Sequence, residues 1–255
     1  YNYLDCSNLP FTWVFTYTIE RVTPPTEFGT PVAITATVEC AAQAIAPALP
    51  VVKDVCGNTL TAPAPVMSGT YTTCEGTIIY TYNYTDCAGL PFTWTFTYTI
   101  DHTSVPVVPA NGTATVQCII DAVTPTVPVV TDVCGVAITP VLNIVENPGP
   151  LVTEGTRTYI YTYTDCSGLS SVWQFEYTID DNIAPVVTGC PATITIQTGA
   201  GRTTCDKNYT WTAPSVTDNC SSLANIAITW TITGATTGSG TGNFNTYVFN
   251  KGTST

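Results

Sequence analysis

The residues of this chain with the clearest chemical potential are its 11 cysteines. Most of them occupy matching positions along the sequence, in the sets Cys40/Cys118, Cys56/Cys134/Cys220 and Cys6/Cys87/Cys166. Cysteines can form disulfides, bind metal ions or act as nucleophiles. Zinc knuckles need two cysteines about two to four residues apart, and the sequence contains no such pair. The recurring positions therefore indicate disulfides and an oxidising compartment.

Catalytic residue types are few and form no recognisable arrangement. His102 is the single histidine, and it lies in a predicted linker, where we expect an exposed side chain. Asp5, Asp86 and Asp165 recur in predicted turns, where aspartate commonly accepts hydrogen bonds from its own backbone. A catalytic pair rarely recurs in every unit of a repeat. The sequence therefore predicts no catalytic site and no enzyme activity.

One cluster of oxygen-bearing side chains lies at a predicted domain joint and consists of Asp180, Asp181 and Asn182. Such clusters at joints are suited to calcium, which prefers oxygen ligands. A solvated acidic turn ahead of a proline is the alternative interpretation. The corresponding joints carry only Glu20 and Asp101 as acidic residues. We therefore expect no cofactor, with calcium at this joint as the open alternative.

A recurring segment organises the sequence around these residues. Residues 3–19 and 84–100 are nearly identical at an offset of 81 (84 − 3), and residues 163–179 form a looser copy. Self-similarity at a fixed spacing is the signature of a repeat array. In the second copy, large side chains alternate with threonine at Phe92, Trp94, Phe96, Tyr98 and Ile100. This period of two predicts a β-hairpin strand with one apolar face in the core.

The predicted fold class is all-β, with tandem immunoglobulin-like antiparallel β-sandwich repeats in an extended array. Many short strands separated by turn signals support this interpretation. Residues 1–21 would form the final hairpin of a preceding or neighbouring domain, and residues 22–102 and 103–182 two complete domains. Residues 183–255 would form a further domain that lacks its final hairpin.

The expected disulfides join cysteines at one end of a single domain. In an immunoglobulin-like topology, the loop between the second and third strands lies beside the last hairpin turn. This arrangement predicts the pairs Cys56–Cys87 and Cys134–Cys166. A local Cys40–Cys56 bridge is the alternative.

The remaining predicted pairs follow the same rule. Cys40 would pair with Cys74 at the opposite end of the domain. Cys118 would be left free, because Thr153 replaces its partner within the same repeat. Cys220 would pair with Cys6 of the next segment and so link successive segments.

Charge and composition exclude several classes of partner. The 255 residues carry a net charge of −12, and only 9% are charged, against about 25% in a typical domain. Nucleic acids and anionic membranes require clustered lysine or arginine, which the sequence lacks. No hydrophobic run is long enough to suggest insertion into a membrane. The composition is typical of β-strands in an extracellular protein.

The hairpin sequence around Asp86 and Phe92–Ile100 resembles the repeats of giant cell-surface adhesins of Bacteroidota, including the gliding-motility adhesin. Residues 189–196 and 214–220 resemble a hyalin-type (HYR) repeat, which is also immunoglobulin-like and extracellular. The resemblance implies export to the bacterial cell surface and a role in adhesion or gliding motility.

These observations favour a structural segment of a secreted filament or adhesin stalk. Copies of the chain, or one continuing chain, would be joined head to tail, with each last domain completed by the next segment's hairpin. The alternative is an adhesive module that binds surface glycans or calcium.

Overall fold

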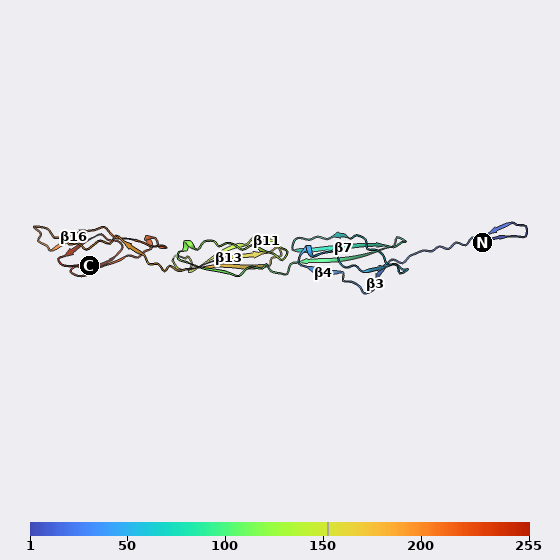
Figure 1. Ribbon diagram of the computed structural model, residues 1–255, viewed down its shortest axis with the longest axis horizontal. Coiled ribbons are helices and arrows are strands. Elements are labelled where there is room, and N and C mark those ends of the chain that lie inside the picture. Colours follow the sequence, from blue (N-terminus) through green and yellow to red (C-terminus); the bar gives the residue numbers. More distant parts are fainter. Residues whose placement is uncertain (152) are drawn as a thin grey trace. The chain divides into compact units, whose positions relative to one another are not determined.

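The structure of the chain is a computed structural model that describes residues 1–151 and 153–255 (Figure 1). Its regular elements are strands β1 to β20 and the short 3-10 turns η1 (Ala41–Gln43), η2 (Ile119–Asp121) and η3 (Leu223–Asn225). The described residues contain no α-helix, and no helix among them could cross a membrane. The all-β fold class expected from the sequence is confirmed, since the small sheets fit tandem β-sandwiches.

The first sandwich combines a four-stranded sheet with a two-stranded one. Its strands are β3 (Thr26–Phe28), β4 (Thr35–Val38), β5 (Val51–Lys53), β6 (Val66–Ser68), β7 (Glu75–Thr85) and β8 (Pro91–Asp101). The larger sheet has the order β4-β8-β7-β6, and β3 pairs with β5. Figure 1 labels β3, β4 and β7 of this sandwich.

The core of the first sandwich lies on one face of the long β7–β8 hairpin. Register places Tyr82 opposite Trp94, with ring centroids 5.8 Å apart. Trp94 is 4% exposed and Ile100 is 1% exposed, whereas the alternating threonines face outwards or lie half-buried. Val52 of β5 belongs to the same buried cluster, so both sheets enclose one core. The predicted apolar face of this hairpin is therefore confirmed as core.

The larger sheet is mixed rather than purely antiparallel as expected. β4 pairs with β8 in parallel, with Thr35 opposite Thr97. The chain leaves the smaller sheet after β3 and reaches the edge of the larger sheet before β4. β4 runs parallel to β8 because the chain crosses between the sheets before β4 instead of turning back in a hairpin.

The second repeat contains a four-stranded sheet with the same arrangement. Its strands are β9 (Gly112–Val116), β10 (Val130–Thr131), β11 (Ala137–Ile138), β12 (Val141–Asn147), β13 (Gly155–Thr164) and β14 (Ser170–Ile179). The sheet order is β12-β13-β14-β9, and β9 again pairs in parallel with the last strand. Tyr161 and Trp173 form the aromatic pair, with centroids 5.7 Å apart.

Residues 183–255 contain a less enclosed set of two-stranded sheets. The strands are β15 (Val186–Thr188), β16 (Asp206–Thr210), β17 (Ser215–Thr217), β18 (Thr229–Ile232), β19 (Gly238–Thr241) and β20 (Thr246–Asn250). They pair as β15-β17, β16-β20 and β18-β19. Among the described residues of this region, Ile232 and Thr236 are the buried ones. Most of its aromatic side chains are only half-buried.

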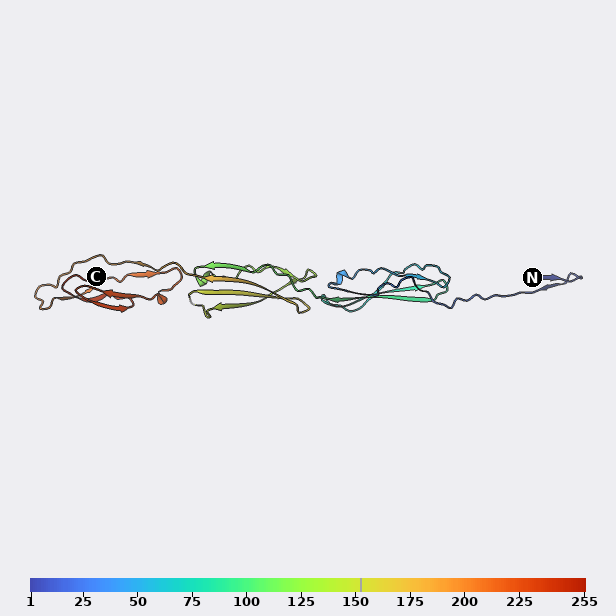
Figure 2. The same ribbon diagram turned by 90° about the horizontal axis from the view of Figure 1, so that it is seen from below.

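The N-terminal copy of the repeated segment forms a small hairpin of β1 (Asn2–Leu4) and β2 (Pro10–Thr12), visible beside the N label in Figure 2. Its apolar row remains exposed: Trp13 is 47%, Phe15 55% and Ile19 95% accessible. The same residue types at the corresponding positions of β8 are buried.

The chain divides into two compact units. One unit contains Tyr1–Val107 together with two loops of the second repeat, Val130–Ile138 and Thr164–Ser170. The other unit contains the remaining described residues. The first sandwich therefore holds two loops that belong, in sequence, to the following repeat.

Replacing Ile100 by alanine should destabilise the first sandwich by about 2–5 kcal/mol, because it removes a fully buried side chain from a closed core. The matched control is Ile19→Ala, at the corresponding and exposed position, which should change stability by less than about 0.5 kcal/mol in a dilute sample. Urea unfolding followed by circular dichroism measures both. Equal effects of the two substitutions would contradict the assigned core.

Candidate functional site

The cysteines form three disulfides among the described residues. The pairs are Cys40–Cys134, Cys74–Cys166 and Cys118–Cys220, with Cα atoms 5.6, 5.9 and 5.1 Å apart. Their sequence separations are 94, 92 and 102 residues. Each bond therefore connects one repeat to the next rather than closing a loop within a domain.

The predicted pairing within single domains is wrong. Cys134 and Cys166 are both bonded, but to different partners in the preceding repeat. Cys40 and Cys74 are not bonded to each other. Cys40 is also not bonded to Cys56, which was the alternative.

The physical reason lies in the direction that the cysteines face. The two loops that carry Cys134 and Cys166 belong to the compact unit of the first sandwich. They bring these cysteines to Cys40 and Cys74, which lie at one end of the first sandwich, beside His102. The sequence analysis grouped the cysteines by the end of the domain at which they lie. It then paired them within one domain instead of across the joint between two repeats.

Two further cysteine predictions also fail. Cys118 is not free, because it bonds to Cys220. Cys220 is therefore not available for Cys6 of a neighbouring segment. Cys6 is a free, exposed cysteine, and so are Cys56 and Cys87.

Aspartate turns hold the joint cysteines in place. Asp132 Oδ1 accepts hydrogen bonds from the backbone N–H groups of Cys134 and Val136, both at 2.8 Å. Asp165 Oδ1 accepts from Ser167 and Leu169, both at 2.9 Å, in the turn that contains Cys166. The same pattern occurs at Asp5 and Asp86, so the predicted role of these repeated aspartates is confirmed.

His102 lies in the joint between the first two repeats and not in an exposed linker. Its side chain is 4% exposed. Nδ1 lies 3.1 Å from Cys74 Sγ, and Nε2 lies 2.9 Å from Cys134 Sγ. The imidazole therefore contacts one sulfur of each disulfide at this joint, and the expectation of an exposed linker residue is wrong.

The joint also brings potential metal ligands together. Two groups, Cys40/His102/Cys134 and Cys74/His102/Cys166, have ligand atoms within 4.8 Å of one another. Zinc binds deprotonated thiols, and these four sulfurs are consumed by disulfides. The arrangement is therefore a covalent joint in its oxidised form. Sequence spacing missed this proximity because the ligands come from two repeats.

Arg21 occupies the position equivalent to His102, at an offset of 81 (102 − 21). Its guanidinium donates to Asp54 Oδ2 at 2.9 Å and lies 3.5 Å from Asp86 Oδ2. It also donates to the sulfur atoms of Cys87 and Cys56, at 3.1 and 3.0 Å. We call these five residues the Arg21 face, namely Arg21, Asp54, Cys56, Asp86 and Cys87.

The surroundings of the Arg21 face shift the pKa of one of its carboxylates. The pKa of Asp54 lies below its ordinary value, mainly because Asn58 Nδ2 donates to the carboxylate at 3.0 Å. Burial opposes this shift, and the backbone N–H of Asn58 and the charge of Arg21 reinforce it. Sequence analysis missed Arg21, although its offset from His102 and the repeated Asp-x-Cys pattern carried the signal.

The joint at Cys118–Cys220 has different surroundings. Asn219 Nδ2 lies 2.9 Å from Cys220 Sγ and 3.4 Å from Asp181 Oδ1. Asp181 Oδ1 also accepts from the backbone N–H of Ile183 at 3.2 Å. Asp181 therefore supports the turn at this joint.

The calcium candidates Asp180 and Asn182 form hydrogen bonds at this joint through their backbone N–H groups. The backbone N–H of Asp180 donates to Val116 O at 3.0 Å, and that of Asn182 donates to Gln117 Oε1 at 3.2 Å. Calcium binding at Asp180, Asp181 and Asn182 stays a prediction.

Cys74→Ser should release Cys166 as a free thiol while Cys40–Cys134 remains, because each bond has its own partner loop. Removing a native disulfide should destabilise the joint by about 2–4 kcal/mol. Peptide mapping without reductant identifies the bonds. The control is Cys190→Ser, which removes an exposed free cysteine. Recovery of a Cys40–Cys74 peptide from the parent chain would contradict the assigned pairing.

Acid should weaken the Arg21 face. Because the pKa of folded Asp54 is lowered, its ionised form stabilises the fold above about pH 4, and this stabilisation is lost as pH falls through the folded pKa. Asp54→Asn should reduce stability at pH 7 and flatten the pH dependence between about pH 2 and 5. Urea midpoints across this range measure the effect. Thr16→Asn, at an exposed position outside the Arg21 face, is the control and should retain the parent slope.

A family model described as a HYR-like domain with 4 cysteines matches residues 28–100 and 106–179. No curated protein matches the chain. The sequence analysis expected the HYR-type repeat in residues 183–255, whereas the match lies in the two preceding repeats.

Residues 28–100 contain four cysteines, of which two bond to the following repeat and two belong to the Arg21 face. HYR-like domains and inter-repeat disulfides together indicate an extracellular protein. Since the matched residues cover more than half of its length, the chain belongs to the family of HYR-like domains with four cysteines.

Proposed function

We propose that this chain is a structural segment of a secreted filament or adhesin stalk rather than an enzyme. The observation that carries the proposal is the set of disulfides between successive repeats. Bonds across joints stabilise no single catalytic pocket. They restrict bending and separation of neighbouring repeats, which is what an extended surface structure requires.

The first joint illustrates the restriction. Cys40–Cys134 and Cys74–Cys166 bond the same two repeats through two different loops. A single bond permits rotation about itself, whereas two bonds from separate loops oppose it. Thr103 and Ser104 of the linker also donate to the carboxylate of Glu39, at 3.1 and 2.7 Å.

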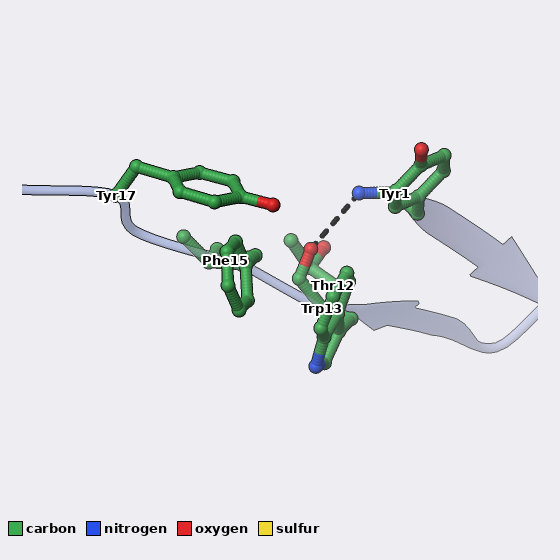
Figure 3. A pocket seen from close by; sticks show the side chains of 6 residues that line it. Tyr1, Thr12, Trp13, Phe15 and Tyr17 are labelled. Atoms are coloured by element: carbon green, nitrogen blue, oxygen red, sulfur yellow. Dashed lines mark hydrogen bonds between the residues drawn. The ribbon is translucent and has the colours of Figure 1, made fainter.

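The exposed hairpin provides a second element of the proposal. Figure 3 shows Tyr1, Trp13, Phe15 and Tyr17 around a hollow, with the N-terminal ammonium donating to Trp13 O at 2.9 Å. The corresponding strand β8 buries the same residue types in a closed core. An exposed aromatic row of this kind is suited to completing a sandwich in another copy.

Residues 183–255 fit the role of acceptor. Trp230 stacks on Phe244 at 4.0 Å between ring centroids, yet both side chains are only half-buried. A hairpin strand laid over these rings would bury apolar surface on both partners. We propose that the hairpin of the next copy completes this domain, so that copies are joined head to tail.

The finer biological role follows the sequence resemblance. We propose a bacterial cell surface as the location, with adhesion or gliding motility of Bacteroidota as the process served. The repeats resemble those of such adhesins in their hairpin sequence, and HYR-like domains are typical of extracellular adhesive or repeat proteins.

The second candidate function is glycan binding by the hairpin. The hollow lined by Tyr1, Thr12 and Trp13 offers aromatic faces and a hydroxyl group, which are the groups that recognise sugars. A glycan array and calorimetry with calcium and a chelator test this candidate. Glycan binding that persists after copies of the chain have assembled would favour the glycan-binding function over the structural role.

Self-association tests the structural proposal. The parent chain should form longer species with increasing concentration, measured by analytical ultracentrifugation. The double variant Trp13→Asp/Phe15→Asp should remain a single chain, because charges on the aromatic row oppose its burial. Thr16→Asp, on the alternate face of the same segment, is the matched control and should assemble. Identical sedimentation of all three would overturn hairpin exchange.

A further inference from the structure

The Arg21 face holds two cysteines that are free and exposed, although their equivalents are bonded. Cys56 corresponds to Cys134, and Cys87 corresponds to Cys166. Both equivalents form disulfides with the preceding repeat, whereas Cys56 and Cys87 form none among the described residues. The same loop positions are therefore seen in a bonded and in an unbonded form within one structure.

We propose that the Arg21 face is a covalent docking site for another repeat of the same family. The partner presents two cysteines at the positions equivalent to Cys40 and Cys74. The first of these bonds to Cys56, and the second bonds to Cys87. The proposal rests on the proposed function, since it requires repeats arranged in series.

The geometry of the face supports a partner of this kind. One guanidinium lies within 3.1 Å of both sulfur atoms, so Cys56 and Cys87 are held beside each other without being bonded. The turns that carry them are fixed by hydrogen bonds to Asp54 and Asp86. Two thiols held on rigid turns match a partner with two thiols at the corresponding spacing.

The linker residue supports the same assignment. His102 contacts Cys134 Sγ at 2.9 Å in the bonded joint, and Arg21 contacts Cys56 Sγ at 3.0 Å in the unbonded one. Each linker side chain thus lies beside the equivalent cysteine of the repeat that follows it. The Arg21 face therefore has the local arrangement of a joint before its disulfides form.

Each bond requires an oxidant, for which we specify a disulfide compound such as oxidised glutathione or the disulfide of a thiol oxidoreductase. One cysteine thiolate attacks this disulfide, forms a mixed disulfide and releases one thiol of the oxidant. The second cysteine thiolate attacks the protein sulfur of the mixed disulfide and releases the other thiol. Two protein thiols lose two electrons and two protons, which the two released thiols carry.

An added repeat tests the proposal on the full chain. A copy of residues 22–81 is placed directly before Tyr1, because Tyr1 corresponds to Tyr82 at an offset of 81 (82 − 1). The copy then continues into the existing hairpin without a gap. After folding with oxidised glutathione, peptide mapping should find the copy's Cys40 bonded to Cys56 and the copy's Cys74 bonded to Cys87. Labelling of Cys56 and Cys87 by a thiol reagent should be lost.

Matched variants assign each bond. A serine in place of the copy's Cys40 should restore labelling of Cys56 and leave the bond to Cys87 intact. Serine in place of the copy's Cys74 should have the reverse effect. The control Cys190→Ser should leave both new bonds unchanged.

The outcomes separate this inference from the proposed function. Radical footprinting of Trp13 reports whether the added repeat has buried the hairpin. A protected Trp13 with free Cys56 and Cys87, or with these two bonded to each other, overturns the inference and leaves the completed sandwich intact. An exposed Trp13 with both thiols free overturns the inference and hairpin completion together. The two expected cross-repeat bonds support it.

Discussion

The length of the β7–β8 hairpin is the constraint on which the joints depend. β7 runs from Glu75 to Thr85, so that Cys74 precedes it and Cys87 follows it. Eleven residues of strand span about 36 Å at about 3.3 Å per residue, whereas disulfide partners need Cα atoms within about 7 Å. These two cysteines must therefore face opposite ends of the sandwich. Each can reach a partner only at its own end, and for Cys74 the following repeat supplies that partner, Cys166.

The same hairpin supplies the rigidity that such joints need. Its aromatic face is buried, with Trp94 and Ile100 nearly inaccessible, and its turn is closed by hydrogen bonds to Asp86. Motion of the turn would therefore strain the packed core. Because Cys87 follows Asp86 directly, the core fixes the position of a cysteine at the far end of the domain. In the second repeat the equivalent Cys166 follows Asp165 directly and bonds to Cys74, so packing inside one repeat determines the geometry of its bond to the preceding one.

The sequence predicted what depends on local periodicity and failed where partners come from different repeats. Alternation at Trp94 and its neighbours identified the hairpin and its buried face, and the repeated Asp86 was correctly interpreted as a turn residue. Parallel pairing of β4 was missed, because no local pattern distinguishes a strand that arrives from another sheet. His102 was expected to be exposed, since its burial arises from cysteines distant in sequence. Cysteine pairing failed for the same reason.

The three linker positions carry different side chains, and the two joints with disulfides share the disulfides and not the linker residue. Arg21 bridges two buried carboxylates, His102 lies between two disulfides, and Asp181 accepts from an asparagine beside the third. A cation, an imidazole and an anion cannot make the same interaction. Asp165 Oδ2 in the joint of His102 and the equivalent Asp86 Oδ2 are both buried without a hydrogen-bond partner among the described residues. Because disulfides hold the joints of His102 and Asp181, these two joints can have different linker residues.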